Sequence, residues 1–175
     1  LNDIDNDGDI DILITNRLEP NEICLNNGKG EFSRILFFGN AEDATIDVEI
    51  SDMNNDGFKD LILANRNNQP NYIYLNNGNL EFIEKKMFGT GSDNTRAIEV
   101  NDFNNDGFKD IVTGNIDEPN VIYFGDKLSN FKKHYVFDDS NSSTFSLSVN
   151  DFNHDGMPDI VVGNSPGLNK IFFNN

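Results

Sequence analysis

Short apolar runs alternate with turn-forming stretches along the chain, in the same order four times. In each repeat an apolar run follows an Asp-rich loop, and a second run follows a polar stretch that contains a proline. A third run begins near a Phe, and the final stretch alternates apolar and polar residues up to the next loop. Strict alternation predicts a strand with one buried face, and nothing recurs at helical spacing. Each repeat is therefore predicted to carry four short strands. The runs cover 12–14, 61–63, 111–112 and 160–162; then 22–25, 72–75, 121–124 and 170–173; then stretches from Phe32, Phe82 and Phe131; and the alternating stretches 46–50, 98–100 and 145–149.

The four repeats are evenly spaced. Their loops begin at Asp3, Asp52, Asp102 and Asp151, which are 49, 50 and 49 residues apart. A four-stranded antiparallel unit with this period is typical of a β-propeller blade. The sequence thus predicts an all-β fold: one propeller segment over residues 1–175, with three, four, four and three strands in its units. About three and a half blades suggest an open arc or fragment of a larger ring, continuous with further blades of a parent chain.

Hairpin signals follow the second run. Asn27-Gly28 and Asn77-Gly78 tolerate positive φ and predict a hairpin to the third run. Gly125-Asp126 replaces this signal in the third repeat and weakens the prediction there.

The Asp-rich loops share the pattern D-x-[DN]-x-D-G-x-x-D, which suits Ca²⁺, a hard cation that takes six to eight oxygen ligands. Short Asp and Asn side chains at positions 1, 3 and 5 can point into one turn, and Gly at position 6 permits a sharp reversal. The carbonyl of position 7 can face the ion, and the Asp at position 9 completes the shell. No His or Cys recurs at a ligand position, which argues against zinc or copper. The candidate ligands for up to four Ca²⁺ are Asp3, Asp5, Asp7, Asp9 and Asp11; Asp52, Asn54, Asp56, Phe58 and Asp60; Asp102, Asn104, Asp106, Phe108 and Asp110; and Asp151, Asn153, Asp155, Met157 and Asp159.

Solvated Asp/Asn/Gly turns are the alternative for any single loop. Four such loops in register argue against it, because clustered acids repel one another without a counter-ion. The apolar residue at position 2 (Ile4, Met53, Phe103, Phe152) is expected to pack inward. His154 and His134 are interpreted as incidental, and Cys24 as a small buried apolar residue in a column with Tyr74, Tyr123 and Phe172.

Charge excludes one class of partner. The net charge is −17, and the four loops hold 14 of the 30 acidic residues but only Lys59 and Lys109 of the 13 basic ones. No nucleic-acid partner is expected, because phosphate binding needs the opposite sign. No apolar segment is long enough for a membrane helix, so no membrane insertion is expected. Asn141-Ser142-Ser143 is a formal glycosylation sequon.

The stretches "DIDNDGDIDILITN", "DMNNDGFKDLILAN", "DFNNDGFKDIVTGN", "DFNHDGMPDIVVGN" and "YLNNGNLEF" resemble the FG-GAP/VCBS repeat family, found in integrin α-subunit propellers and many bacterial surface proteins. The resemblance covers essentially the whole chain. It implies a β-propeller with a Ca²⁺ loop between the first and second strands of each blade. EF-hands share the start of the motif but need an acid at position 12 and a following helix.

Three functions are open at this point. The first is an extracellular or cell-surface module for protein or glycan binding and adhesion, stabilised by structural calcium that is plentiful outside cells. The second is an enzyme built on a calcium-rich propeller; no nucleophile motif or phosphate-binding loop is evident, and we expect no catalysis. The third is a non-catalytic scaffold within a larger secreted carbohydrate-active enzyme, such as a polysaccharide lyase.

Overall fold

The protein is described by a computed structural model that covers residues 1–140 and 142–175. These residues form fourteen strands in four antiparallel sheets. The described residues contain no helix, and so none that could cross a membrane. Asn141, the acceptor of the predicted sequon, lies outside the described residues.

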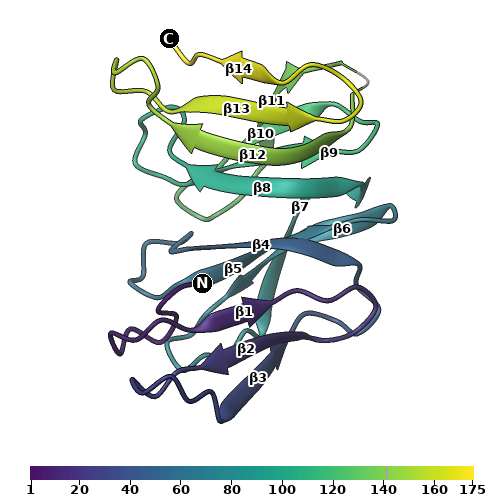
Figure 1. Cartoon of the computed structure of the whole chain (residues 1–175). Helices are drawn as coiled ribbons and strands as arrows, with labels where there is room; N and C mark the ends of the chain where they lie inside the picture. The colour runs from purple at the N-terminus through teal and green to yellow at the C-terminus, as the bar shows by residue number, and fades with distance from the viewer. Residues whose placement is uncertain (141) are drawn as a thin grey trace.

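Each sheet is a simple up-and-down meander, and the sheets follow one another along the chain (Figure 1). We call them blades 1 to 4. They hold three, four, four and three strands, as the sequence predicts. Blade 1 comprises β1 (Ile12–Ile14), β2 (Asn21–Leu25) and β3 (Arg34–Phe38); blade 2 comprises β4 (Thr45–Ser51), β5 (Asp60–Asn65), β6 (Gln69–Leu75) and β7 (Glu84–Asp93); blade 3 comprises β8 (Thr95–Asn101), β9 (Asp110–Asn115), β10 (Asn120–Phe124) and β11 (Lys133–Asp138); blade 4 comprises β12 (Thr144–Asn150), β13 (Asp159–Asn164) and β14 (Lys170–Phe172).

The hydrophobic core lies between the blades. Strand β5 is buried along its whole length, because Leu61 and Leu63 pack toward blade 1 whereas Ile62 and Ala64 pack toward blade 3. A third cluster joins blades 3 and 4 around Phe103. Burial on both faces explains why these second strands are continuous apolar runs rather than alternating ones.

Buried Asn and Thr side chains also link neighbouring blades. Asn71, near the start of β6, donates from Nδ2 to Thr95 Oγ1 of blade 3 at 2.8 Å. Its Oδ1 accepts the backbone N–H of Asn65 at 2.7 Å. In the same way Asn21 bonds Thr45 between blades 1 and 2, and Asn120 bonds Thr144 between blades 3 and 4. The two partners are 24 residues apart in each link. These bonds satisfy polar groups that would be costly to bury unpaired.

The last two strands of blades 1, 2 and 3 are joined by longer connections than a two-residue Asn-Gly turn. Strand β2 ends at Leu25 and β3 begins at Arg34, and of Asn27 and Gly28 only the glycine has a positive φ, 76°. The hairpins predicted from Asn27-Gly28 and Asn77-Gly78 form, but through a longer connection than two residues. The hairpin also forms in blade 3, where it was expected to be weak: a Cβ on Gly125 would lie 2.2 Å from the Lys109 carbonyl oxygen, so glycine is required there.

Candidate metal-binding loops

The Asp-rich loops join the first and second strands of the blades, as the family resemblance implies. Residues 52–59 connect β4 to β5, 102–109 connect β8 to β9, and 151–158 connect β12 to β13. Strands β8 and β12 run in the same direction, so their loops lie on the same side of the arc (Figure 1). The first loop precedes β1 and is closed by a bridge between Asn2 and Asp11.

All four loops adopt one turn, which the second loop illustrates. The carboxylate of Asp52 accepts the backbone N–H groups of Asp56 at 3.1 Å and Gly57 at 2.8 Å. Asn54 Oδ1 accepts the Asp56 N–H at 3.0 Å, and Asp56 Oδ1 accepts the Phe58 N–H at 2.8 Å. The side chains at positions 1, 3 and 5 are thereby held on the inside of the turn. The corresponding bonds recur in the other loops.

Two positions of the turn are left-handed. Gly57 at position 6 has φ 92° and Asn55 at position 4 has φ 59°, and the other loops repeat both values closely. Asn and His are among the few non-glycine residues that accept this conformation. His154, interpreted as incidental, therefore occupies a position where Asn stands in the other three loops, and its φ is 62°. The recurrence of Asn at position 4 was the signal that sequence reasoning did not use.

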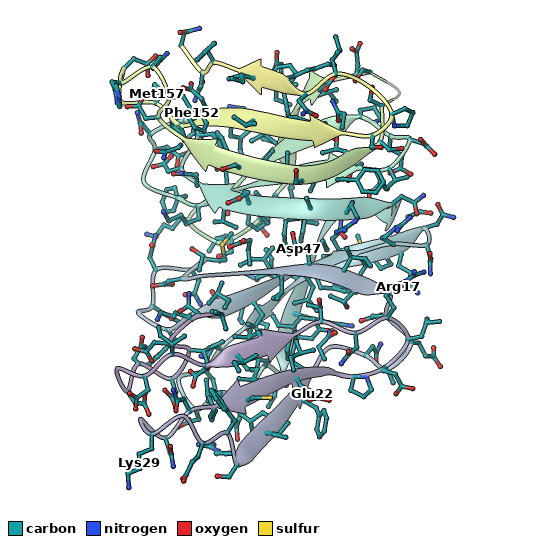
Figure 2. All side chains as sticks on the ribbon, in the orientation of Figure 1. Arg17, Glu22, Lys29, Asp47, Phe152 and Met157 are labelled. Carbon is teal, nitrogen blue, oxygen red and sulfur yellow. The ribbon has the colours of Figure 1, made fainter. Side chains whose placement is uncertain are left out.

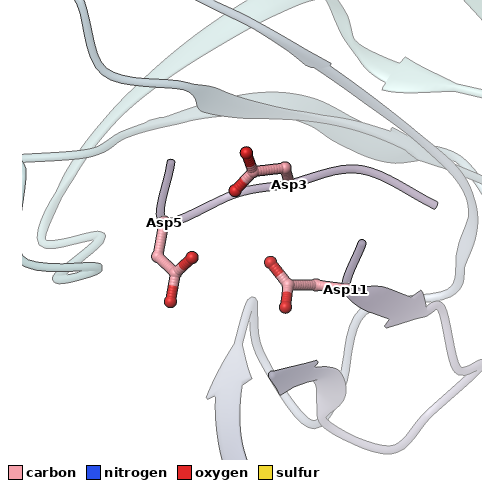
Figure 3. A group of neighbouring side chains, drawn as sticks. All are labelled: Asp3, Asp5 and Asp11. Atoms are coloured by element: carbon pink, nitrogen blue, oxygen red, sulfur yellow. The ribbon is translucent and has the colours of Figure 1, made fainter. Parts of the chain in front are cut away.

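The first loop gathers three carboxylates. Asp3, Asp5 and Asp11 each place one carboxylate oxygen so that all three oxygens lie within 4.8 Å of one another. Figure 3 shows the three side chains pointing toward a shared space. Asp11 is fully buried, whereas Asp3 and Asp5 are partly exposed. This spacing and this all-oxygen donor set fit a hard divalent cation such as Ca²⁺.

In the other three loops an amide replaces the second carboxylate. Asn54, Asn104 and Asn153 donate from Nδ2 to the carboxylates of Asp56, Asp106 and Asp155 at 2.8, 2.9 and 2.7 Å. Positions 3 and 5 are thus in contact in each loop. Position 7 is also tied to position 5. The backbone N–H groups of Asp9, Phe58, Phe108 and Met157 donate to the position-5 carboxylates.

The Asp at position 9 is buried and hydrogen-bonded in all four loops. Asp60 accepts the backbone N–H of Met53 at 2.9 Å with one oxygen and that of Asn76 at 2.9 Å with the other. Asp11, Asp110 and Asp159 do the same. These carboxylates tie each loop to the chain just after the strand that pairs with the loop's following strand, for example after β6 in blade 2. The sequence analysis did not predict this role. The recurring Asn after that strand (Asn26, Asn76) was the available signal.

Burial makes two of these carboxyl groups, those of Asp60 and Asp110, reluctant to ionise. Burial raises the pKa of Asp60 and of Asp110 to about 6, against the pull of their backbone hydrogen bonds. Burial, with the nearby charges of Asp11 and Asp7, also raises the pKa of Asp5. A bound cation would offset this penalty, because an opposite charge favours the ionised form.

The apolar residue at position 2 is buried in three loops and exposed in the fourth. Ile4, Met53 and Phe103 are 1%, 3% and 4% exposed, as predicted. Phe152 is 43% exposed, so the prediction was wrong there. Figure 2 shows Phe152 beside Met157 at the end of blade 4. The inward position depends on a neighbouring blade, and no further sheet covers this face in the described part of the chain.

Each of the first three loops also receives a hydrogen bond from the next blade. Lys59 Nζ donates to the Asp3 carbonyl, Ser129 Oγ to the Met53 carbonyl at 2.9 Å, and Asn174 Nδ2 to the Phe103 carbonyl at 2.8 Å. The loops are therefore part of the blade interfaces and not free surface turns.

Comparisons with known proteins agree with this geometry. A family model described as an FG-GAP-like repeat matches residues 3–63, 52–113 and 102–162. The chain is also similar to the β-propeller in the crystal structure of BBS1N in complex with ARL6DN, soaked with lead. That similarity has a TM-score of 0.63 at 14% identity and covers 97% of this chain and 54% of the other. At this identity it concerns the fold alone. A search of curated proteins found no match to the sequence.

Proposed function

This chain belongs to the FG-GAP-like repeat family, and from that premise we propose that it is a calcium-binding β-propeller module that serves protein or glycan binding and adhesion at the cell surface or outside the cell. The module is proposed to be non-catalytic, with one structural Ca²⁺ in each of its four loops. The observation that carries the proposal is the convergence of Asp3, Asp5 and Asp11 on one point.

Electrostatics supports a cation at that point. Three ionised carboxylates within 4.8 Å repel one another strongly unless a positive charge lies between them. The remaining loops repeat the same backbone turn, so each offers the oxygens of positions 1, 3, 5 and 9 and the carbonyl of position 7. The set fits Ca²⁺ better than Mg²⁺, which demands a more regular octahedral shell and gives up water reluctantly.

The role of the ion would be structural. Each loop joins two strands and also contacts the next blade, so an ion that fixes the turn stabilises both a hairpin and an interface. A site at a free Ca²⁺ concentration of about 100 times its Kd gains roughly 2.7 kcal/mol by mass action. Sites of moderate affinity therefore suit the millimolar calcium found outside cells. The net charge of −17 favours protein or glycan partners over nucleic acid.

Calorimetric titration of the EDTA-stripped chain with Ca²⁺, beside melting curves, tests the proposal. We expect close to four ions per chain and a large rise in melting temperature, with a much smaller response to Mg²⁺. The variant that carries Ala at Asp7, Asp56, Asp106 and Asp155 is the control, and it should bind no calcium. Absence of binding to the unmodified chain at millimolar Ca²⁺ would overturn the proposal.

A further inference from the structure

A groove of about 860 Å³ lies between blades 2 and 3. Strand β7 forms one wall, and β10 and β11 form the other, so we call it the β7–β11 groove. Its size is in the range of sites that enclose small ligands or peptide segments.

Both walls end in an edge strand. β7 is the last strand of blade 2 and β11 the last strand of blade 3. Their outward N–H and C=O groups have no partner strand within the described residues, and edge strands of this kind can pair with an extended peptide. The position does not depend on how many blades the ring has, because the fourth strand of a blade is its outer edge in any propeller.

The groove carries charges of both signs, and its basic residues gather at one end. Asp93 and Glu118 line the end that holds Asn115, whereas Lys86 near the start of β7 and Lys132 just before β11 line the opposite end. In a chain of net charge −17, five of the 13 Lys and Arg residues and one of the two His lie at the start of β7 or at the approach to β11: Lys85, Lys86, Lys127, Lys132, Lys133 and His134. Three of them, Lys86, Lys132 and His134, line the groove itself. Lys86 Nζ already donates to the Leu128 carbonyl at 2.5 Å across the blade gap. Lys132 and the His134 ring, both exposed, remain at this end of the groove as donors for a carboxylate.

The middle of the groove is apolar and partly open. The His134 ring lies 5.9 Å from the Tyr123 ring, and Met87 and Val136 remain 57% and 41% exposed. Met adapts its shape to different apolar partners. This part of the groove therefore suits an aliphatic side chain.

A polar acceptor without a donor lies in the wall at the far end. Asn115 is 5% exposed, and its Oδ1 has no hydrogen-bond partner among the described residues. In blades 2 and 4 the equivalent Oδ1 atoms, of Asn65 and Asn164, each accept a Thr hydroxyl at 2.9 Å. An unpaired buried acceptor is unfavourable, but this oxygen is itself buried, so it is a cost of the fold at this end of the groove and not a ligand contact.

We propose that the β7–β11 groove binds an extended acidic peptide segment of a partner protein, with its carboxylates at Lys132 and His134 and an aliphatic side chain between Met87 and Val136. The peptide supplies alternating backbone N–H and C=O groups that can pair with an edge strand, which a sugar chain does not. This inference rests on the proposed role as a binding module and names its partner.

The test uses a fluorescein-labelled peptide of four Asp-Val repeats and the full chain in millimolar Ca²⁺, with binding measured by fluorescence anisotropy. We expect Lys132→Glu with His134→Glu to weaken binding at least about tenfold, because close opposite charges become like charges. Lys133→Glu is the matched control: Lys133 precedes His134 but lies over the Phe124 ring, 5.0 Å from its centroid, on the opposite face of the strand. It should change affinity less than about twofold. Melting curves must show that all variants are folded.

Two results would overturn the inference: no binding of the peptide to the unmodified chain, or an equal loss in the Lys133→Glu control. If a galacturonic acid oligomer binds with the same dependence on Lys132 and His134 and the peptide does not, the partner is a glycan and the peptide assignment is wrong. Calcium titration of the same sample separates the two proposals. Calcium binding without peptide binding defeats only the groove, and peptide binding without calcium binding defeats only the metal sites.

Discussion

Ser129 Oγ of blade 3 donates a buried hydrogen bond of 2.9 Å to the carbonyl of Met53, position 2 of the metal-binding loop of blade 2. Ser129 is 1% exposed and Met53 3% exposed, so water does not replace this bond. The loop and its neighbouring blade are therefore mechanically joined. Occupancy of the loop and docking of the next blade should reinforce each other.

Ser129→Ala tests this coupling. Leaving the Met53 carbonyl unpaired should cost about 1–3 kcal/mol of unfolding free energy. The loss should be larger in Ca²⁺ than in EDTA, and the affinity of one of the four sites should fall. Denaturant unfolding in both conditions measures it. Ser165→Ala, at an exposed position, should change stability by less than about 0.5 kcal/mol. Identical losses in the two conditions would show that the bond stabilises the interface but not the loop.

The first loop should bind calcium most tightly. It carries Asp5 where the other loops carry Asn, and within the described residues it is the one loop with three carboxylate oxygens inside 4.8 Å. Because affinity rises with the number of charged ligands, Asp5→Asn should lower the affinity of the tightest site about tenfold. Asn54→Asp in the second loop is the reciprocal change and should tighten that site. Calorimetric titration measures the affinities of both variants. An unchanged affinity of the tightest calcium site in Asp5→Asn would exclude Asp5 as a ligand.

The connection after β6 depends on the position-7 side chain of the metal loop. A Cβ on Gly78 would lie 2.6 Å from the Phe58 ring, and Gly78 also has φ 87°. Gly78→Ala should therefore cost about 2–4 kcal/mol, from left-handed strain together with overpacking. Gly91→Ala is the matched control, since Gly91 has the same φ but only ordinary contacts with Met87, and it should cost about 1 kcal/mol. Adding Phe58→Ala should recover part of the Gly78→Ala loss in thermal unfolding; no recovery would place the strain elsewhere.

Local patterns were enough to predict the strands and the loops. Strict alternation predicted β4, β8 and β12. Three of the four Asp-x-[Asp/Asn]-x-Asp-Gly stretches lie between the first and second strands of a blade, and the remaining one directly precedes β1. The column of Cys24 with Tyr74, Tyr123 and Phe172 was also confirmed, because each pairs with the corresponding apolar residue of the preceding strand. These features depend on neighbours within one repeat, which sequence periodicity reports directly.

Contacts between repeats were not predictable in the same way. The Asn71–Thr95 link recurs three times over 24 residues, yet nothing in one repeat shows that the two side chains meet. Exposure of Phe152 likewise depends on whether a sheet packs on its face, which its own motif does not encode. Where two blades meet, packing decides burial and pairing, and a single-repeat pattern carries no information on either.

The inner strands of blades 2 and 3 place carboxylates together, and this predicts a pH dependence. Burial, with the neighbouring charges of Glu99 and Asp47, raises the pKa of Glu49 to about 7 from an ordinary value of 4.5. Figure 2 places Asp47 on β4, facing β8, where its carboxylate accepts the Ile98 N–H at 3.1 Å. Because the folded-state pKa of Glu49 lies above the unfolded value, the folded protein holds this proton more tightly, and the stability it contributes is lost as pH rises from about 4.5 to 7. Glu49→Gln should therefore stabilise the protein by about 1–2 kcal/mol at pH 8, after allowance for solvent screening, and by little at pH 4.5. Denaturant unfolding across this pH range measures the difference, with Glu22→Gln in blade 1 as the control. A gain in stability that did not depend on pH would show that folding does not raise the pKa of Glu49.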